Sequence, residues 1–93
     1  MHERDVDRKL VREVLDRDGI ALKLSCPGMD GMPDRLILLT GGRVGFAEIK
    51  APGQHPRPLQ LRRKRQLETL GFRVFVIDRP DQIGGVLDEL QAP

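Results

Sequence analysis

Apolar side chains recur at helical spacing near the start of the chain, within residues 3–18. Residues three or four positions apart share one face of a helix, so this spacing predicts an amphipathic helix. The apolar stripe consists of Val6, Leu10, Val11, Val14 and Leu15. Gly19 follows and is predicted to cap the helix. Glu3 falls in line with the stripe and Glu13 at its edge, so a carboxylate is expected to face the core side at the helix start.

Short apolar runs separated by glycine and proline predict four strands. The predicted strands cover residues 20–25, 33–40, 43–50 and 72–78. The second and third flank Gly41-Gly42, the pattern of a hairpin with a two-residue turn. A loop over residues 26–32 precedes this hairpin, so the first three strands are expected to form a meander.

Two further helices are predicted after the meander. Residues 59–70 end at Gly71, a typical C-terminal cap. Asp81 is expected to cap a last short helix, although Gly84 and Gly85 disfavour it. The element order is then αβββαβα. A meander followed by a helical crossover predicts an α/β fold, with one mixed four-stranded sheet flanked by helices, in a single domain over residues 1–93.

Length and composition narrow the functional classes. A chain of 93 residues suits one small domain, whose limited core favours self-association. Its apolar runs are too short to span a membrane and its charged start lacks a signal-peptide pattern, so we expect a cytoplasmic protein with no membrane partner. The single cysteine, Cys26, forms no internal disulfide, and no zinc-ligand spacing is present.

Basic residues are concentrated in one segment, although the net charge is only +2. Residues 57–65 contain five basic and no acidic side chains, which is suitable for phosphate contacts. A solvated helix face is the alternative explanation of such a run. Three phenylalanines without tyrosine or tryptophan disfavour base stacking on single strands, so duplex DNA is the expected ligand.

Two carboxylates and a lysine are expected to meet at one end of the predicted hairpin. Side chains alternate along a strand, so Glu48 and Lys50 point to the same face. Asp34 opens the partner strand at a matching distance from the turn, and cross-strand pairing can place it beside Glu48. Adjacent carboxylates repel unless a cation lies between them, and hard oxygen ligands suit Mg²⁺ or Mn²⁺.

The alternative for each residue alone is structural. Aspartate after proline often forms a turn, and a Glu/Lys pair on a strand is usually a solvated ion pair. The combination favours phosphodiester hydrolysis, in which the metal neutralises phosphate oxygens and activates water. Lys50 is then expected to orient that water or to stabilise the charge that develops at phosphorus.

Two motifs contain these residues: Gly31-Met32-Pro33-Asp34-Arg35 and Phe46-Ala47-Glu48-Ile49-Lys50-Ala51-Pro52-Gly53. At these positions, and more weakly over almost the whole chain, the sequence resembles the VRR-NUC family of nucleases, a branch of the PD-(D/E)XK superfamily. The resemblance implies a restriction-endonuclease-like fold, a bacterial or phage setting and a Mg²⁺- or Mn²⁺-dependent endonuclease.

The resemblance also implies roles for individual residues. Asp34, Glu48 and the Ile49 carbonyl would ligate metal, Lys50 would be the catalytic lysine, and Glu3 and Gln60 would complete the site, with Glu3 as a further candidate ligand. Structural alternatives are that Glu3 only favours a helix N-terminus and that Gln60 is simply exposed. Glu13 is the alternative to Glu3.

Several basic residues are candidate contacts to the DNA backbone, because lysine and arginine supply most of the affinity for duplex DNA. They are Lys23, Arg35, Arg62, Arg63, Lys64 and Arg65. His55 is interpreted as a plain loop residue. Gly41-Gly42 with Gly45 lacks the lysine and hydroxyl residue of a phosphate loop, so no nucleotide cofactor is expected.

The resemblance to compact phage and bacterial members leads to the hypothesis of a homodimer that resolves Holliday junctions. Small size and the lack of the additional helices found in larger relatives favour it. The alternatives are a flap or nicking nuclease of the same family, a non-catalytic module that binds branched DNA, and a structural protein whose charges only decorate its surface.

Overall fold

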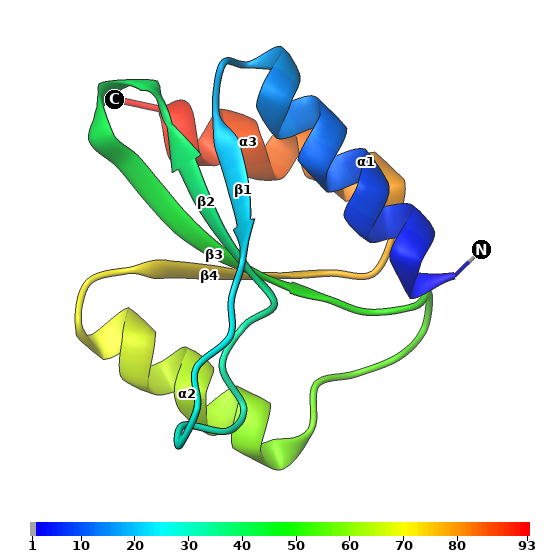
Figure 1. Ribbon diagram of the computed structural model, residues 1–93, viewed down its shortest axis with the longest axis vertical. Helices are drawn as coiled ribbons and strands as arrows, with labels where there is room; N and C mark the ends of the chain where they lie inside the picture. The colour runs from blue at the N-terminus through cyan, green and yellow to red at the C-terminus, as the bar shows by residue number, and fades with distance from the viewer. Residues whose placement is uncertain (1) are drawn as a thin grey trace.

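A four-stranded mixed sheet organises the computed structural model, which describes residues 2–93 (Figure 1). The strands β1 (Ile20–Lys23), β2 (Arg35–Leu39), β3 (Arg43–Ile49) and β4 (Arg73–Ile77) are arranged in sequence order. Neighbours are antiparallel from β1 to β3, whereas β4 is parallel to β3. Parallel pairing requires a crossover, which contains helix α2 (Pro58–Thr69). The predicted α/β class and the order αβββαβα are confirmed.

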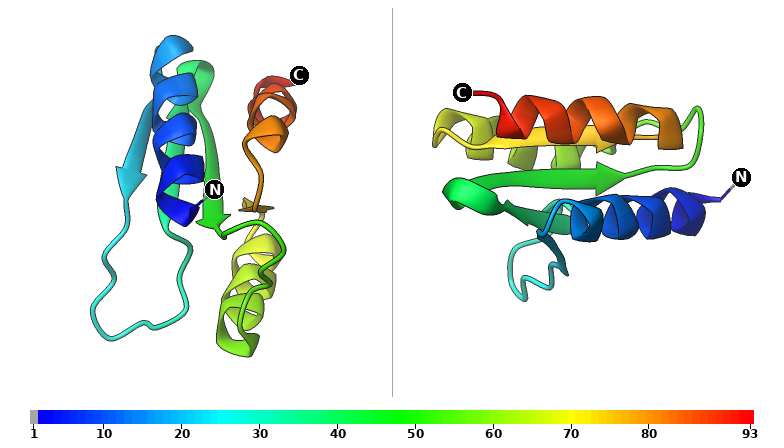
Figure 2. Two further views of the ribbon diagram at one scale, coloured as in Figure 1. Left: turned by 90° about the vertical axis from the view of Figure 1, so that its right-hand side faces the viewer. Right: turned by 90° about the horizontal axis from the view of Figure 1, so that it is seen from above.

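Helices α1 (Glu3–Asp16) and α3 (Ile83–Gln91) lie side by side on one face of the sheet, with α2 on the other (Figures 1 and 2). The core lies under α1 and α3, where Val6, Leu10 and Val14 have no exposed surface. These residues are the centre of the stripe predicted from the sequence, whereas Leu15 at its edge is exposed. No helix within residues 2–93 combines the length and the apolar character that a membrane crossing requires.

The opposite face of the sheet is also apolar, but only part of it is covered. Strand alternation and register place six apolar residues there, and we call them the open sheet face: Ile20, Leu22, Leu36, Leu38, Val44 and Phe46. Helix α2 packs against β4 and lies away from β1. Ile20 is 53% and Leu22 43% exposed. A monomeric domain rarely leaves so contiguous an apolar surface in water.

The hairpin between β2 and β3 differs from the prediction. Leu39 pairs with Arg43, so the turn has three residues, Thr40–Gly42, and the predicted two-residue turn is wrong. Gly41 and Gly42 both have positive φ, at 77° and 72°, which suits glycine. The longer turn determines the register of the strands, and through it the pairing at the open end of the hairpin.

The end of α1 also differs from the prediction. The helix ends at Asp16, and Asp18 with φ of 61° takes the left-handed conformation expected of Gly19. Gly19 is required for a different reason, because a Cβ atom there would lie 2.5 Å from the Leu38 carbonyl oxygen. Its role is close packing of the chain against β2.

The start of α3 corrects the prediction for Asp81. A 3₁₀ turn, Pro80–Gln82, precedes α3, and no side-chain cap by Asp81 is present. The Gln82 side chain instead accepts hydrogen bonds from the backbone N–H groups of Asp78 and Arg79, at 2.9 and 3.2 Å. Gln82 therefore orders the connection between β4 and α3.

Candidate active site

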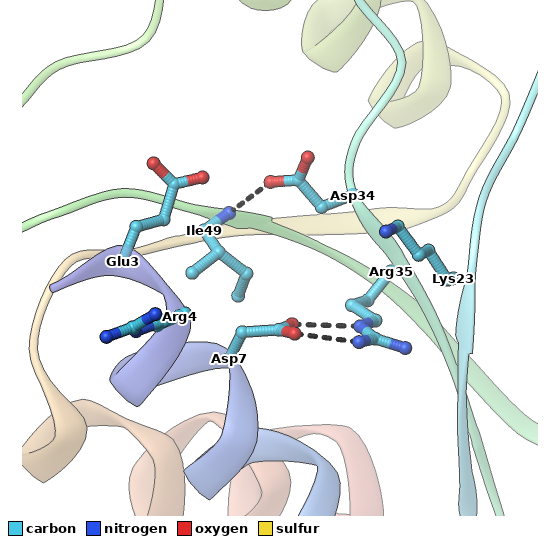
Figure 3. Close-up of a pocket in the computed structure, with 7 residues that line it drawn as sticks. All are labelled: Glu3, Arg4, Asp7, Lys23, Asp34, Arg35 and Ile49. Carbon is cyan, nitrogen blue, oxygen red and sulfur yellow. Dashed lines mark hydrogen bonds and ion pairs between the residues drawn. The ribbon is translucent and has the colours of Figure 1, made fainter.

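Asp34 and Glu48 come together at the open end of the β2–β3 hairpin. Arg35 pairs with Ala47, and continuing this register by one residue places Asp34 opposite Glu48. The Asp34 carboxylate accepts a hydrogen bond of 2.8 Å from the Ile49 backbone N–H (Figure 3). This bond holds the carboxylate against the end of β3, in the position expected from the sequence.

Glu48 is the one buried charged residue within residues 2–93, with 4% of its surface exposed. Its Oε1 atom has no hydrogen-bond partner among the described residues. Burial, as the larger cause, and the adjacent Asp34 carboxylate together raise the pKa of Glu48 to about 8. A buried oxygen without a donor is destabilising, and a cation between the two carboxylates would relieve this.

Lys50 directly follows the end of β3, two residues after Glu48. Ala47 and Ile49 point into the core under α1 and α3, so Glu48 points to the face that carries α2, as predicted from strand alternation. The Lys50 backbone N–H donates to the Ile77 carbonyl at 2.9 Å and fixes the end of the strand. The Lys50 charge acts to lower the pKa of Glu48, which opposes the larger effect of burial.

A cleft of about 400 Å³ opens beside Asp34 (Figure 3). Its walls are Glu3, Arg4, Asp7, Lys23, Asp34, Arg35 and Ile49. Helix α1 begins next to the end of β3, which places Glu3 in the cleft (Figure 1). Glu13 instead lines a separate hollow beside Lys9 and Arg12. The structure therefore brings Glu3, and not its alternative Glu13, to the cleft beside Asp34.

Arg35 lies in the cleft wall and forms an ion pair that the sequence did not predict. Its Nε and NH2 atoms donate to the two carboxylate oxygens of Asp7 at 2.8 and 2.7 Å, and its NH1 atom donates to the Ala21 carbonyl at 3.2 Å. The hydrogen bonds to Asp7 raise the pKa of Arg35. These contacts join α1, β1 and β2 at the cleft. Asp7 follows Glu3 by one helical turn, and this spacing was the available signal for it.

Gln60 lies near Glu48, but its amide oxygen is already in use. The two residues line a small cavity of about 10 Å³, which holds roughly one water molecule. The Gln60 Oε1 atom accepts a hydrogen bond of 2.8 Å from the Arg57 backbone N–H at the start of α2. Gln60 therefore helps to begin the helix, and a role in the site stays a prediction.

Some of the basic residues predicted to contact DNA already have hydrogen-bond or ion-pair partners inside the described part of the protein, and others do not. Arg63 donates to the Asp30 carbonyl at 2.8 Å and fixes the loop before β2, and Lys64 pairs with Glu68 at 3.0 Å. Arg62 and Arg65 are exposed, and neither has an ion-pair partner within residues 2–93. Lys23 is exposed and lines the cleft.

The oxygen donors at the site suit a hard divalent cation. No group of three or more His, Cys, Asp or Glu side chains is arranged to hold a metal in the described part of the chain. The carboxylates of Asp34 and Glu48 are the side-chain oxygens that meet at the end of the hairpin, and the Ile49 carbonyl stays a predicted ligand. Mg²⁺ and Mn²⁺ accept such oxygen ligands and complete their coordination with water.

Two known proteins are similar to this chain over most of its length. No family model matches the sequence. A protein described as "Putative nuclease p44", from Acyrthosiphon pisum secondary endosymbiont phage 1, is 44% identical over 81 residues, which cover 87% of each chain. A solved structure described as "VRR_NUC domain" superposes with a TM-score of 0.86 and 30% identity, covering 92% of this chain and 94% of that one.

Proposed function

Because the chain belongs to the VRR-NUC family of nucleases, we propose that it is a divalent-metal-dependent endonuclease that cuts branched duplex DNA, acting as a homodimer on Holliday junctions. One observation carries the catalytic part of this proposal. The buried Glu48 has an unpartnered oxygen beside Asp34, and Lys50 follows two residues later. Paired carboxylates with a neighbouring lysine suit phosphodiester hydrolysis.

Asp34, Glu48 and the Ile49 carbonyl would hold Mg²⁺ or Mn²⁺. When bound, the cation supplies charge neutralisation at the phosphate and activation of water. The Ile49 N–H keeps the Asp34 carboxylate oriented through its 2.8 Å hydrogen bond. Burial of Glu48 strengthens its interaction with any cation, because little water competes for the carboxylate.

Lys50 is the residue that acts on the reacting groups. Its ammonium orients the attacking water or stabilises the negative charge that develops on the phosphate oxygens. Glu3 enters the cleft from α1 and adds a carboxylate opposite Asp34, as a further metal ligand or as a partner for the attacking water. Gln60 provides a polar wall beside Glu48.

The open sheet face supports the homodimer. An apolar sheet face is normally covered by another layer of structure, and a second copy of the chain can provide it. Pairing through this face would bury Ile20 and Leu22, which are among the most exposed large apolar residues of the described chain. Two active sites related by twofold symmetry suit symmetric cutting of a four-way junction.

The catalytic proposal is tested with labelled four-way junction, flap and linear duplex, incubated with Mg²⁺ or Mn²⁺. Paired nicks on the junction that disappear in Asp34→Asn and Lys50→Ala are expected. Asp88→Asn is the matched control, since this carboxylate is 73% exposed and pairs only with Arg17. Preferred cutting of the flap favours a flap nuclease, and binding of the junction without cutting favours a non-catalytic module.

The dimer is tested by sedimentation equilibrium of wild type and Leu22→Glu. Wild type is expected at about twice the 10.5 kDa of one chain, and the variant at one chain. Leu70→Glu is the control, because Leu70 is 66% exposed but follows α2, outside the open sheet face. A monomeric wild type at all concentrations would remove the dimer from the proposal.

A further inference from the structure

We propose that three arginines on the outer surface of α1 bind the DNA backbone next to the scissile phosphodiester. This arginine ridge consists of Arg4, Arg8 and Arg12. The inference rests on the proposed nuclease function for its ligand, but it concerns a surface outside the catalytic carboxylates.

The ridge has the spacing of a phosphate-tracking surface. Residues four apart share one edge of a helix and rise about 6 Å per step, so the three arginines span roughly 12 Å. This length covers about three to four nucleotides of one strand of B-DNA, which advances 3.4 Å per nucleotide. All three side chains are exposed. None has a hydrogen-bond or ion-pair partner within residues 2–93.

Acidic residues of α1 do not neutralise the ridge, although the helix contains more acids than bases. Asp7 lines the same cleft as Arg4 but is held by Arg35, and Asp5 accepts a hydrogen bond from the His2 backbone N–H at 2.9 Å. Glu13 lies 4.0 Å from Lys9 and buries one carboxylate oxygen. Asp5 and Glu13 line the same hollow as Arg8 and Arg12, but no acidic side chain within residues 2–93 forms an ion pair with a ridge arginine.

The ridge is continuous with the candidate active site. Arg4 lines the same cleft as Glu3 and Asp34, and it leaves α1 on the side away from Arg35 (Figure 3). Arg8 and Arg12 line the next hollow along the helix. A duplex whose phosphate lies at Asp34 can therefore continue along α1. Helix α1 covers the face opposite the open sheet face, so a dimer formed there leaves both ridges exposed.

The α2 segment offers fewer available charges than its composition indicates. Arg63 and Lys64 are engaged by the Asp30 carbonyl and Glu68, which leaves Arg57, Arg62 and Arg65 of the basic segment, residues 57–65. Counter-ion release depends on how many cationic side chains reach phosphates, and internal pairing reduces that number. Within the described chain, the ridge therefore presents as many unpaired arginines as residues 57–65 do, and we assign it a comparable share of the salt-dependent affinity.

The test measures affinity for a short labelled DNA duplex and for a four-way junction in EDTA, so that no cutting occurs. The triple variant Arg4→Gln, Arg8→Gln and Arg12→Gln is compared with the triple Arg→Lys variant, which keeps the charges. Arg43→Gln is the control for the loss of an arginine elsewhere on the surface; the Arg43 side chain donates to the Ala92 carbonyl at 2.8 Å. Arg43 is exposed and lies at the far end of β3, roughly 20 Å of strand from Ile49.

The glutamine variant is expected to lower the slope of log affinity against log salt by about 2.7 in magnitude, at about 0.9 per phosphate contact. For each phosphate contact, a tenfold rise in salt, from about 0.1 M to about 1 M, lowers the affinity roughly eightfold. Each arginine that is removed takes away one such factor. The lysine variant and Arg43→Gln are expected to keep the wild-type slope. Helical circular dichroism verifies that every variant folds.

An unchanged slope in the glutamine variant, or an equal reduction in Arg43→Gln, would overturn the inference. These results are separate from the test of catalysis. Loss of binding in the ridge variant of a protein that never cuts DNA supports the ridge and contradicts the nuclease proposal. If wild type cuts DNA but its binding does not depend on the ridge, the nuclease proposal is supported and the ridge is contradicted.

Discussion

Replacing Glu48 by glutamine is expected to stabilise the metal-free protein near neutral pH. The carboxyl is 4% exposed and one of its oxygens has no partner in the described chain. Burial and Asp34 raise its pKa from 4.5 to about 8. The folded state therefore favours the protonated acid, which glutamine imitates without a charge. Removing the charge should increase the free energy of unfolding wherever the wild type would have to ionise.

The magnitude follows from linkage between proton binding and folding. A pKa that is higher in the folded state contributes stability below pH 4.5, and this stability is lost as the pH rises to about 8. At about 1.4 kcal/mol per pH unit, the wild type loses on the order of 3 kcal/mol by about pH 7. The free energy of unfolding of a small domain is about 5–15 kcal/mol, so a change of this size is measurable.

The assay is urea unfolding of wild type and Glu48→Gln in EDTA, repeated from about pH 4.5 to about pH 8. The two proteins should be similar at the acid end and diverge steadily toward neutral pH. Glu89→Gln is the control, since this glutamate is 60% exposed beside Arg73 and should show little pH-dependent difference. Excess Mg²⁺ or Mn²⁺ should stabilise wild type by about 2.7 kcal/mol at a hundred times its Kd, and the variant much less.

A difference between wild type and Glu48→Gln that stays constant with pH would refute this reasoning. It would mean that Glu48 ionises in the folded protein as readily as an exposed carboxylate. Equal stabilisation of both proteins by the divalent ion would show that the ion binds elsewhere.

Three further predictions follow from the cleft and its supports. Asp7→Asn should cost about 1–3 kcal/mol in urea unfolding, because Arg35 loses its charged partner; a double variant with Arg35→Gln should cost less than the two single changes combined. Gly19→Ala should lower stability by about 1–3 kcal/mol through its clash with the β2 backbone, and an unchanged Tm would contradict this. Glu3→Gln should reduce kcat on the preferred substrate by roughly 10- to 100-fold, while Glu13→Gln leaves kcat unchanged; equal kcat values in these two variants would remove Glu3 from the site.

The carboxylate pair was predictable because it depends on local rules. Strand alternation determined which way Glu48 points, and the hairpin brought Asp34 opposite it. The turn was predicted one residue too short, but the register remained close enough to pair the two carboxylates. Helical periodicity likewise placed Glu3 on the side of α1 that reaches the cleft.

Features that depend on tertiary packing were not predictable from the sequence. The Asp7–Arg35 ion pair forms only because α1 packs on the sheet near the start of β2, and no short-range sequence pattern indicates that packing. The arginine ridge was not predicted because α1 contains more acidic than basic residues. Only the structure shows which acidic side chains form ion pairs and with which partners. The contact of Arg63 with the Asp30 carbonyl was not predictable for the same reason, and the DNA contacts of residues 62–65 stay a prediction.

The most direct test of the central claim compares wild type and Lys50→Ala on one labelled four-way junction, with binding and Mg²⁺-dependent cutting measured in the same samples. The account predicts that both proteins bind the junction and that only wild type cuts it. Cutting by Lys50→Ala at the wild-type rate would show that hydrolysis takes place without this lysine, and would contradict the assignment of the active site.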